Sequence, residues 1–426
     1  MSVLPDQFDY KPRVVDRQVE RRLDLVPTVL IEGPRGCGKT TTARRLANRE
    51  VLLDEDASAR GHAEHGTLPL GDGPYPLLID EWQLAPQTWN RVRRASDDPL
   101  GAGRFILTGS ANPTDDITRH SGAGRVARVR MRPMSLYESG KADGSVSLAS
   151  LLDGGTCSAW RPGPAEAQLR EAVEALCRGG WPVCRSMTVA DAQEFLDIYL
   201  EEICRVDVPR VNGTRHNPGG VRRALVSLAR HTASSPTGST LASDIGGARP
   251  VAFETLTAYL DALARIFICE DQPAWSPHLA SRSRLRKAPK RHLADPALAV
   301  CALGAGPSRL LADRGMLGHL FESLVVRDLR IYAQAAGASV FHYLDSNRLE
   351  ADAIIRRRDG AWLAVEVELG ADSSIDAASA SLLKLRRRVD TERMGGPSKL
   401  LVVTATGYAY ERPDGVAVAP LALLGP

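Results

Sequence analysis

The chain has 426 residues, of which 43% are hydrophobic and 25% charged, with a formal net charge of +3. This length predicts about three domains of roughly 150 residues each, and the composition is that of a soluble globular protein. The small net charge does not by itself indicate a nucleic-acid partner.

The cysteines and the apolar runs exclude several classes of protein. The seven cysteines are scattered without a Cys-x-x-Cys pair, so we expect reduced thiols and no zinc ribbon. No apolar run reaches the roughly 18 residues of a membrane span. Residues 1–10 contain acids and lack the apolar core of a signal peptide. We therefore expect a cytoplasmic protein with no membrane contact.

Residues 10–26 precede the first buried strand. Charged residues such as Arg13 and Asp16 alternate there with aliphatic residues such as Val15 and Val19. This spacing predicts a surface helix that packs on the core and holds its charges on a solvated face.

Residues 33–40 match the pattern G-x-x-x-x-G-K-[ST] of the P-loop, which binds nucleotide phosphates. The apolar run 29–31 predicts a strand before the loop, and residues 41–47 predict a helix after it. Gly36 and Gly38 allow a tight backbone whose N–H groups face the phosphates. Lys39 supplies a cation, and the Thr40 hydroxyl is a ligand for Mg²⁺. We therefore predict that ATP and Mg²⁺ bind to Gly33, Pro34, Arg35, Gly36, Cys37, Gly38, Lys39, Thr40 and Thr41.

Two carboxylates end the apolar run 77–79, after a second expected strand at 50–54. Placed downstream of a P-loop, Asp80 would support the Mg²⁺ shell and Glu81 would polarise the attacking water, as in a Walker B motif. The alternative is an acid pair that caps a helix at a strand end.

Residues 104–107 predict a third buried strand, which ends in Thr108 and Ser110. In P-loop ATPases of the AAA+ kind, a polar group at this place senses the γ-phosphate; the alternative is a strand-capping turn. Arg125 could act as an arginine finger on its own nucleotide or on a neighbour's, and the second case implies a homo-oligomer. We expect one solvated strand face to carry Arg128, Arg130 and Arg132.

The order of motifs is specific. It comprises Gly-Pro-Arg-x-x-Gly-Lys-Thr from 33, Ile-Asp-Glu-x-Gln from 79, Pro86, Phe-Ile-Leu-Thr-Gly-Ser from 105, Gly-Arg at 124–125, Arg-Pro-Met-Ser-Leu-Tyr-Glu at 132–138, Gly-Gly-Trp-Pro at 179–182, Tyr199, Asp207 and Pro-Lys…Asp at 289–295. This series resembles the prokaryotic AAA-type P-loop ATPases, AAA+ or STAND-like, that carry a C-terminal domain of unknown function. Trp82 departs from the small aliphatic residue usual there. The resemblance implies an ATPase domain over residues 1–140.

For the middle of the chain we expect a linker and helical region over 141–218, with the polar stretch 140–163 as the linker. Residues 240–247 and 252–263 form a helix–turn–helix pattern, and 264–270 read as a strand. The pattern and the resemblance both predict a winged helix over 219–300, whose second helix could enter a DNA groove. Its exposed residues are not basic, so packing or contact with a protein partner stays equally open; they are Glu254, Thr255, Thr257 and Asp261.

A basic cluster follows the expected winged helix. It is either a phosphate track for DNA or a solvated loop, and it contains Arg282, Arg284, Arg286, Lys287, Lys290 and Arg291.

Residues 301–426 predict a helix that carries Glu322, strands at 339–343, 350–356 and 361–369, a helix at 378–389 and a strand at 399–404. This order resembles the PD-(D/E)xK nuclease fold. Asp352 and Glu366 match its two metal-binding acids, whereas Glu368 stands where the fold has its lysine. Residues 366 and 368 share one side of a strand. We expect an inactive or structural domain, with a second metal site at Asp352, Glu366 and Glu368 as the alternative.

The sequence thus predicts an α/β protein in which a parallel-sheet P-loop domain precedes a winged-helix region and a nuclease-like domain. We expect an Mg²⁺-dependent ATPase that uses Lys39, Asp80, Glu81, Ser110 or Thr108, and Arg125, and that drives a C-terminal module on DNA. The alternatives are a STAND-like switch that binds a protein partner, and a metal-dependent nuclease.

Overall fold

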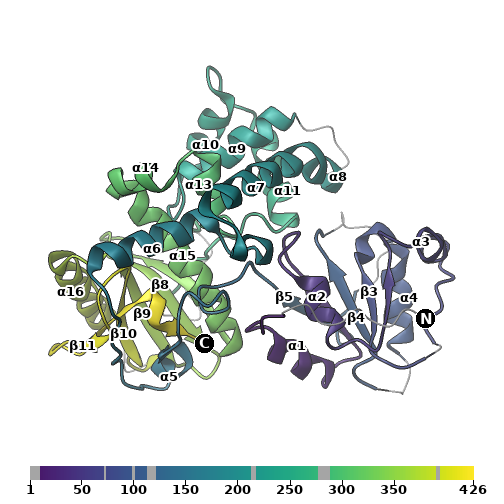
Figure 1. The fold of residues 1–426 in the computed structure, drawn as a ribbon, viewed down its shortest axis with the longest axis horizontal. Coiled ribbons are helices and arrows are strands. Elements are labelled where there is room, and N and C mark those ends of the chain that lie inside the picture. The colour runs from purple at the N-terminus through teal and green to yellow at the C-terminus, as the bar shows by residue number, and fades with distance from the viewer. Residues whose placement is uncertain are drawn as a thin grey trace.

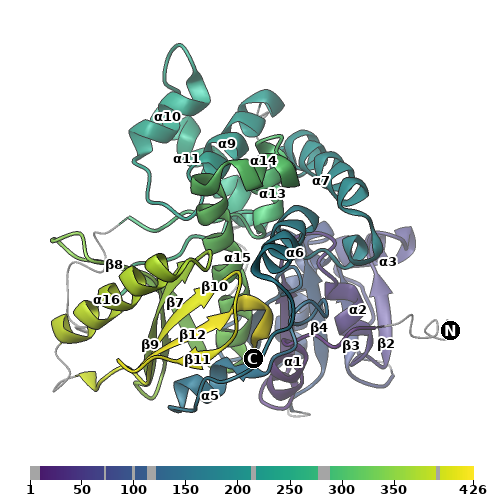
Figure 2. The same cartoon turned by 60° about the vertical axis from the view of Figure 1, so that its left-hand side comes forward.

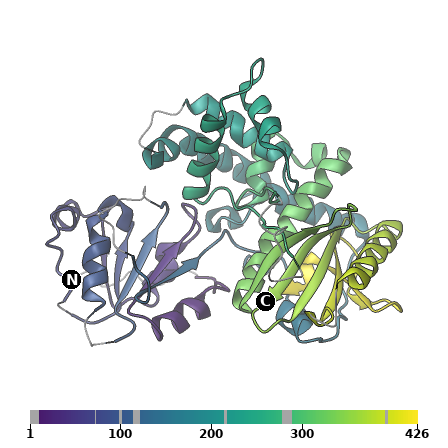
Figure 3. The same ribbon diagram turned by 180° about the vertical axis from the view of Figure 1, so that it is seen from behind.

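The computed structural model describes residues 10–71, 73–97, 101–112, 121–212, 217–276, 288–389 and 394–426. These residues form an N-terminal part (10–138), a helical middle (165–312) and a C-terminal part (314–426). The helical middle lies across the two sheet-containing parts (Figures 1 and 3). Within the described ranges, no helix combines the length and the apolar character needed to cross a membrane.

The N-terminal part is built on a parallel sheet of order β2-β3-β4-β1-β5. Its strands are β1 (Thr28–Glu32), β2 (Arg49–Leu52), β3 (Leu77–Asp80), β4 (Phe105–Gly109) and β5 (Val126–Arg130). Aliphatic residues from α1 and α2 pack on one face, and those from α3 and α4 pack on the other. The helices are α1 (Asp16–Leu23), α2 (Lys39–Arg44), α3 (Ala57–Glu64) and α4 (Gln87–Ala95). The predicted parallel-sheet P-loop domain is confirmed.

Several charges expected on solvated faces are instead internal. Arg13 and Asp16 are buried, because Arg13 pairs with Glu138 and Asp16 accepts hydrogen bonds from Tyr10 and the Arg13 backbone. The solvated face expected for Arg128, Arg130 and Arg132 is correct only for Arg128, which is exposed and pairs with Glu32. Arg130 instead stacks on Phe267, and Arg132, just after β5, pairs with Glu270.

The polar stretch expected as a linker is a strap on the C-terminal part. β6 (Val146–Ser147) pairs with β13 (Leu424–Gly425), and Ala159 pairs with Ala409. The intervening α5 (Leu148–Leu152) begins at Ser147, whose side chain caps it, and its leucines are buried. Aliphatic residues spaced among the small polar ones therefore dock this stretch onto the protein.

The helical middle shares one core with part of the C-terminal sheet. Its helices are α6 (Ala165–Arg178), η2 (Pro182–Ser186), α7 (Val189–Glu202), the π-helical turn η3 (Ile203–Asp207), α8 (Val208–Asn212), α9 (Pro218–Arg230), α10 (Gly238–Gly246), α11 (Phe253–Arg265), α13 (Pro296–Ala302) and α14 (Pro307–Ala312). The two predicted helices of the helix–turn–helix are present as α10 and α11. The strand expected at 264–270 is not formed, because α11 continues to Arg265; residues 269 and 272 make only isolated antiparallel bridges with 293 and 290.

The C-terminal part is a mixed sheet of order β11-β12-β10-β9-β8-β7 between α15 (Arg314–Ala335) and α16 (Asp372–Arg388) (Figure 2). The predicted order of helices and strands is observed, while the likeness to a nuclease stays a prediction. The remaining elements are β7 (Ala338–Leu344), β8 (Glu350–Arg357), β9 (Trp362–Glu368), β10 (Lys399–Thr404), β11 (Tyr410–Glu411), β12 (Val416–Pro420) and η4 (Leu421–Leu423).

Candidate functional site

The P-loop follows β1 at the carboxyl edge of the N-terminal sheet. Gly36 and Gly38 have φ of 73° and 103°, a backbone region that favours glycine. A Cβ on Gly33 would lie 2.0 Å from the Met131 carbonyl oxygen, so only glycine fits there. Lys39 is buried, and its Nζ donates to the Pro34 carbonyl at 3.0 Å. The loop therefore holds its cation within its own turn.

The structure brings the two predicted Mg²⁺-binding residues together. Thr40 Oγ1 donates to Asp80 Oδ1 at 2.8 Å, and the Thr108 hydroxyl also donates to Oδ1. Burial raises the pKa of Asp80 above its usual value, and these two hydrogen bonds oppose that rise. A hydroxyl and a carboxylate held in contact are the protein oxygen ligands that Mg²⁺ prefers, so these residues could hold the ion.

Glu81 stands at the next position with a left-handed backbone, φ +52°. Such a conformation costs a non-glycine residue of the order of 1–3 kcal/mol. Ser110 Oγ donates to Glu81 Oε2 at 2.8 Å, and the Gln83 amide donates to the same carboxylate and to Ser110 Oγ. The two sensor candidates therefore have different partners: Thr108 holds Asp80, and Ser110 holds Glu81. The sequence interpretation gave Gln83 no role, although it lies within the Ile-Asp-Glu-x-Gln motif.

Arg125 does not lie near the P-loop. Its carbonyl accepts from Thr28 N at the start of β1, whereas the P-loop follows the end of that strand. Its side chain pairs with Asp97. The expectation of a finger acting on its own nucleotide is therefore wrong, because parallel pairing of β1 and β5 places Arg125 at the opposite edge of the sheet. Action on a neighbouring chain stays a prediction.

The helical middle contacts the P-loop directly. Trp181 Nε1 and Tyr199 Oη each donate to the Arg35 carbonyl at 3.1 Å. Arg35 Nη1 lies 3.5 Å from Asp207 Oδ1, in the π-helical turn. π-Helical turns are frequent at functional sites. This contact joins segments more than 140 residues apart in the sequence.

A cavity of about 290 Å³ lies at this contact. The N-terminal part lines it with Arg35, Gln83 and Ser110, and the helical middle lines it with Tyr199, Asp207 and Arg210, among others. Burial raises the pKa of Asp207, while Arg35 and Arg210 oppose the rise. Arg210 was not selected as a site residue from the sequence. The Tyr199…Asp207 motif, which ends three residues before Arg210, could have pointed to it.

A buried ion pair anchors the P-loop from its other side. Arg13 Nη1 donates to the Cys37 carbonyl at 2.8 Å, and Arg13 Nε lies 3.0 Å from Glu138 Oε1. Glu138 also accepts from Val14 N at 2.8 Å. Glu138, the last residue of the 132–138 motif, therefore positions Arg13, and Arg13 in turn hydrogen bonds to the P-loop.

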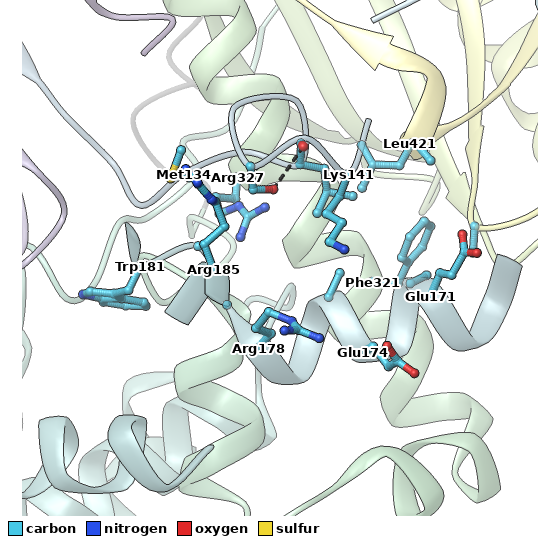
Figure 4. A pocket seen from close by; sticks show the side chains of 18 of the residues that line it. Met134, Lys141, Glu171, Glu174, Arg178, Trp181, Arg185, Phe321, Arg327 and Leu421 are labelled. Carbon is cyan, nitrogen blue, oxygen red and sulfur yellow. Dashed lines mark hydrogen bonds between the residues drawn. The ribbon is translucent and has the colours of Figure 1, made fainter. Parts of the chain in front are cut away.

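A second cavity, of about 190 Å³, lies where the three parts meet (Figure 4). Lys141 and Arg178 reach toward it from opposite sides. Arg327 also lines the cavity and is buried between Asp295 and Asp328, each 2.7 Å away. Asp328 Oδ2 in turn accepts from Leu136 N at 2.9 Å. A continuous ionic network therefore ties α15 both to the helical middle and to the segment that leaves the N-terminal part.

The three acids predicted as a second metal site lie in the C-terminal part. The side chains of Asp352 and Glu366 lie in contact. Glu368 lines a groove of about 690 Å³ together with Glu322. The predicted three-acid metal site is not assembled among the described residues. Among the described residues, no group of three or more His, Cys, Asp or Glu side chains is arranged to hold a metal ion.

Only the end of the basic cluster can be compared with its prediction, because 277–287 lie outside the described residues. Lys290 is buried among carboxylates, and Arg291 pairs with Asp271. Lys290 is thus internal, and Arg291 is half-buried with its guanidinium paired to an acid, so neither forms part of an exposed phosphate track.

Comparison with known families defines the class to which this site belongs. Residues 26–140 match the AAA domain, residues 169–309 a domain of unknown function (DUF8612), and residues 317–424 another (DUF4143). The chain therefore carries an AAA-type P-loop ATPase domain, followed by domains of unknown function.

Individual relatives are distant. The chain is 26% identical over 317 residues to the uncharacterized proteins Rv2008c of Mycobacterium tuberculosis and Mb2031c of Mycobacterium bovis. Each match covers 73% of this chain and 64% of the relative, so the chain spans less than two thirds of their length. Among solved structures it is similar to the Walker-type ATPase PABY2304 of Pyrococcus abyssi, with 18% identity and a TM-score of 0.44 over 71% of this chain and 99% of that one.

Proposed function

We propose that this chain is an Mg²⁺-dependent ATPase that works as a nucleotide switch. Its helical middle is the part that changes its contact with the P-loop when the bound nucleotide changes. One observation carries the proposal: Trp181 and Tyr199 of the middle both hydrogen bond to the Arg35 carbonyl of the P-loop. The loop that would bind the phosphates is thereby hydrogen bonded to the helical middle.

The chemical roles follow from the contacts within the N-terminal part. Lys39 neutralises phosphate charge, and Thr40 and Asp80 hold Mg²⁺, which supplies electrostatic stabilisation of the transferred phosphoryl group. Glu81 orients and polarises the attacking water. Ser110 and Gln83 both donate hydrogen bonds to the Glu81 carboxylate, so the orientation of this carboxylate depends on these two side chains.

The response follows from electrostatics in the 290 Å³ cavity. Arg35 is shared between the P-loop and Asp207, and Arg210 lines the same space. A γ-phosphate beside Ser110 adds negative charge near both arginines and competes with Asp207 for Arg35. ATP and ADP therefore differ in how strongly they hold the π-helical turn against the P-loop.

The test uses the indole of Trp181 as a reporter. Fluorescence of the full chain carrying Glu81→Gln, which keeps ATP intact, is recorded with ATP–Mg²⁺, with ADP–Mg²⁺ and without nucleotide. We expect a change between ATP and ADP that disappears in the Glu81→Gln/Trp181→Phe double variant, since phenylalanine cannot donate to Arg35. A control with Trp160→Phe, a highly exposed tryptophan, keeps the change. Identical spectra with all ligands would contradict the switch.

A DNA-directed motor is the second candidate, because α10 and α11 are followed by paired antiparallel segments, the order predicted for a winged helix. Turnover measured with and without duplex and single-stranded DNA, at low and high salt, separates the two. Stimulation that fades with salt supports the motor. Turnover that is indifferent to DNA supports a switch that acts on a protein partner.

A further inference from the structure

The nuclease-like centre of the C-terminal part contains a lysine from a distant segment. Lys290 Nζ lies 2.7 Å from Glu322 Oε1, 2.7 Å from Glu350 Oε1 and 3.0 Å from Asp352 Oδ1. Its side chain is only 5% exposed. Glu322 comes from α15 and the other two acids from β8, whereas Lys290 comes from the extended segment that pairs with Gln272 in the helical middle.

The oxygens of this centre are already engaged. Asp352 Oδ2 accepts from Val367 N at 2.9 Å, so both oxygens of Asp352 have partners. Glu366, which contacts Asp352, accepts from Ser381 Oγ at 2.9 Å. A metal ion would have to compete with these hydrogen-bond donors for the lone pairs of the same carboxylate oxygens.

The charge balance also favours a fixed ammonium. The Lys290 Nζ lies within 3.0 Å of three carboxylates, those of Glu322, Glu350 and Asp352, and its side chain is almost fully buried. An ammonium at this place offsets negative charge that would otherwise be buried without a partner, which is strongly unfavourable.

We propose that Lys290 is the resident cation of this centre: its ammonium stands between Glu322 and Asp352 in the place of a divalent metal ion, so the C-terminal part acts without cleaving phosphodiesters. Separations of 2.7–3.0 Å suit N⁺–H···O⁻ hydrogen bonds, whereas Mg²⁺ requires oxygens at about 2.0–2.1 Å in an octahedron.

Lys290 donates hydrogen bonds to Glu322 Oε1 and Asp352 Oδ1, so the lysine binds the same acids that a metal ion would need. It also joins the centre to the helical middle, so the acids form a fixed joint between two parts of the chain.

The experiment measures Mn²⁺ binding by electron paramagnetic resonance on the full chain without nucleotide, together with cleavage of supercoiled plasmid in Mg²⁺ or Mn²⁺. The variants are Asp352→Asn, Lys290→Met, the double variant Lys290→Met/Asp352→Asn, and Lys384→Met on the exposed side of α16 as the matched control. In the wild type we expect no Mn²⁺ site that Asp352→Asn removes, and no cleavage.

Replacing the ammonium by an apolar group of similar length leaves buried acids without their cation, which is strongly unfavourable. Lys290→Met should therefore gain one Mn²⁺ site per chain, about tenfold or more tighter than any in the wild type. The double variant should lose that site, and Lys384→Met should not gain it.

Three outcomes would overturn the proposal. The first is a wild-type Mn²⁺ site that Asp352→Asn abolishes. The second is plasmid cleavage lost in both Lys290→Met and Asp352→Asn, which would make Lys290 a working nuclease lysine. The third is a folded Lys290→Met chain that gains no site. If Lys290→Met does not fold, the comparison of wild type with Asp352→Asn decides alone. ATP turnover is unaffected by these outcomes, so they are separable from the proposed switch.

Discussion

Thr40 and Asp80, 40 residues apart in the sequence, are joined by a hydrogen bond of 2.8 Å from hydroxyl to carboxylate. This hydrogen bond holds the P-loop and the end of β3 in contact, where the proposed function places Mg²⁺. Preorganised ligands of this kind lose little free energy to rearrangement on binding.

Lys39→Ala should abolish measurable ATP binding. The lysine is the buried cation of the P-loop, and no other lysine occurs between residues 33 and 40. Isothermal titration of ATP–Mg²⁺ into the variant checks this, with Lys384→Ala on α16 as the control that keeps wild-type affinity. Wild-type affinity in Lys39→Ala would contradict the assignment of the phosphate site.

Glu81→Gln should keep ATP binding and lose turnover by about 10²–10⁴-fold, the range for removal of a general base. Ser110→Ala should cause a smaller loss, because Gln83 still holds the carboxylate. Steady-state phosphate release checks both variants. Full turnover by Glu81→Gln would contradict the catalytic role of Glu81. An equal loss in both variants would mean that Ser110 alone orients the Glu81 carboxylate.

Arg210→Ala should lower turnover about tenfold or more, because a cation near developing phosphate charge stabilises the transition state. The matched control is Arg205→Ala, whose exposed side chain pairs with Glu201 one helical turn away. At low protein concentration Arg125→Ala should match the wild type, since it lies at the opposite edge of the sheet. A loss in Arg125→Ala that grows with protein concentration would reveal an oligomer with a shared site.

Arg13→Ala should destabilise the fold by about 3–5 kcal/mol, the cost of leaving a buried partner charge unpaired. Here Glu138 loses its cation, and the Cys37 carbonyl of the P-loop loses a donor. Urea unfolding of the full chain checks this, with the exposed Arg17→Ala as the control. A change under 1 kcal/mol in Arg13→Ala would show that the pair contributes no more than a surface ion pair.

Glu366→Gln should flatten the pH dependence of stability. The pKa of Glu366 is raised in the fold by burial, so the native state keeps a proton that the unfolded chain releases above about pH 4.3. Stability from this group is therefore full below that pH and is lost as the pH rises through the native pKa. Unfolding midpoints between pH 5 and 8.5 check this, with the exposed Glu254→Gln as the control. Equal slopes in wild type and Glu366→Gln would contradict it.

The sequence by itself determined the N-terminal site to a large extent. The P-loop and the Asp80-Glu81 pair are local patterns, and each follows a short apolar strand. The carboxyl ends of parallel strands meet at one sheet edge, so the adjacency of Thr40 and Asp80 follows from topology alone. The helices and strands of the C-terminal part were predicted for the same reason, because their patterns are local and strongly periodic.

Tertiary structure decided which charges meet. Arg125 follows a motif but sits at the wrong end of its strand, and nothing in its local sequence distinguishes the two ends. Trp181 reaches the P-loop, and Arg210 the cavity beside it, only because the helical middle folds back across the N-terminal part (Figure 1). The sequence placed Lys290 in a basic cluster that was either a phosphate track or a solvated loop, yet it lies among acids from α15 and β8. Ion pairs between distant segments have no sequence period, because a charge responds to whatever the fold brings within a few ångströms.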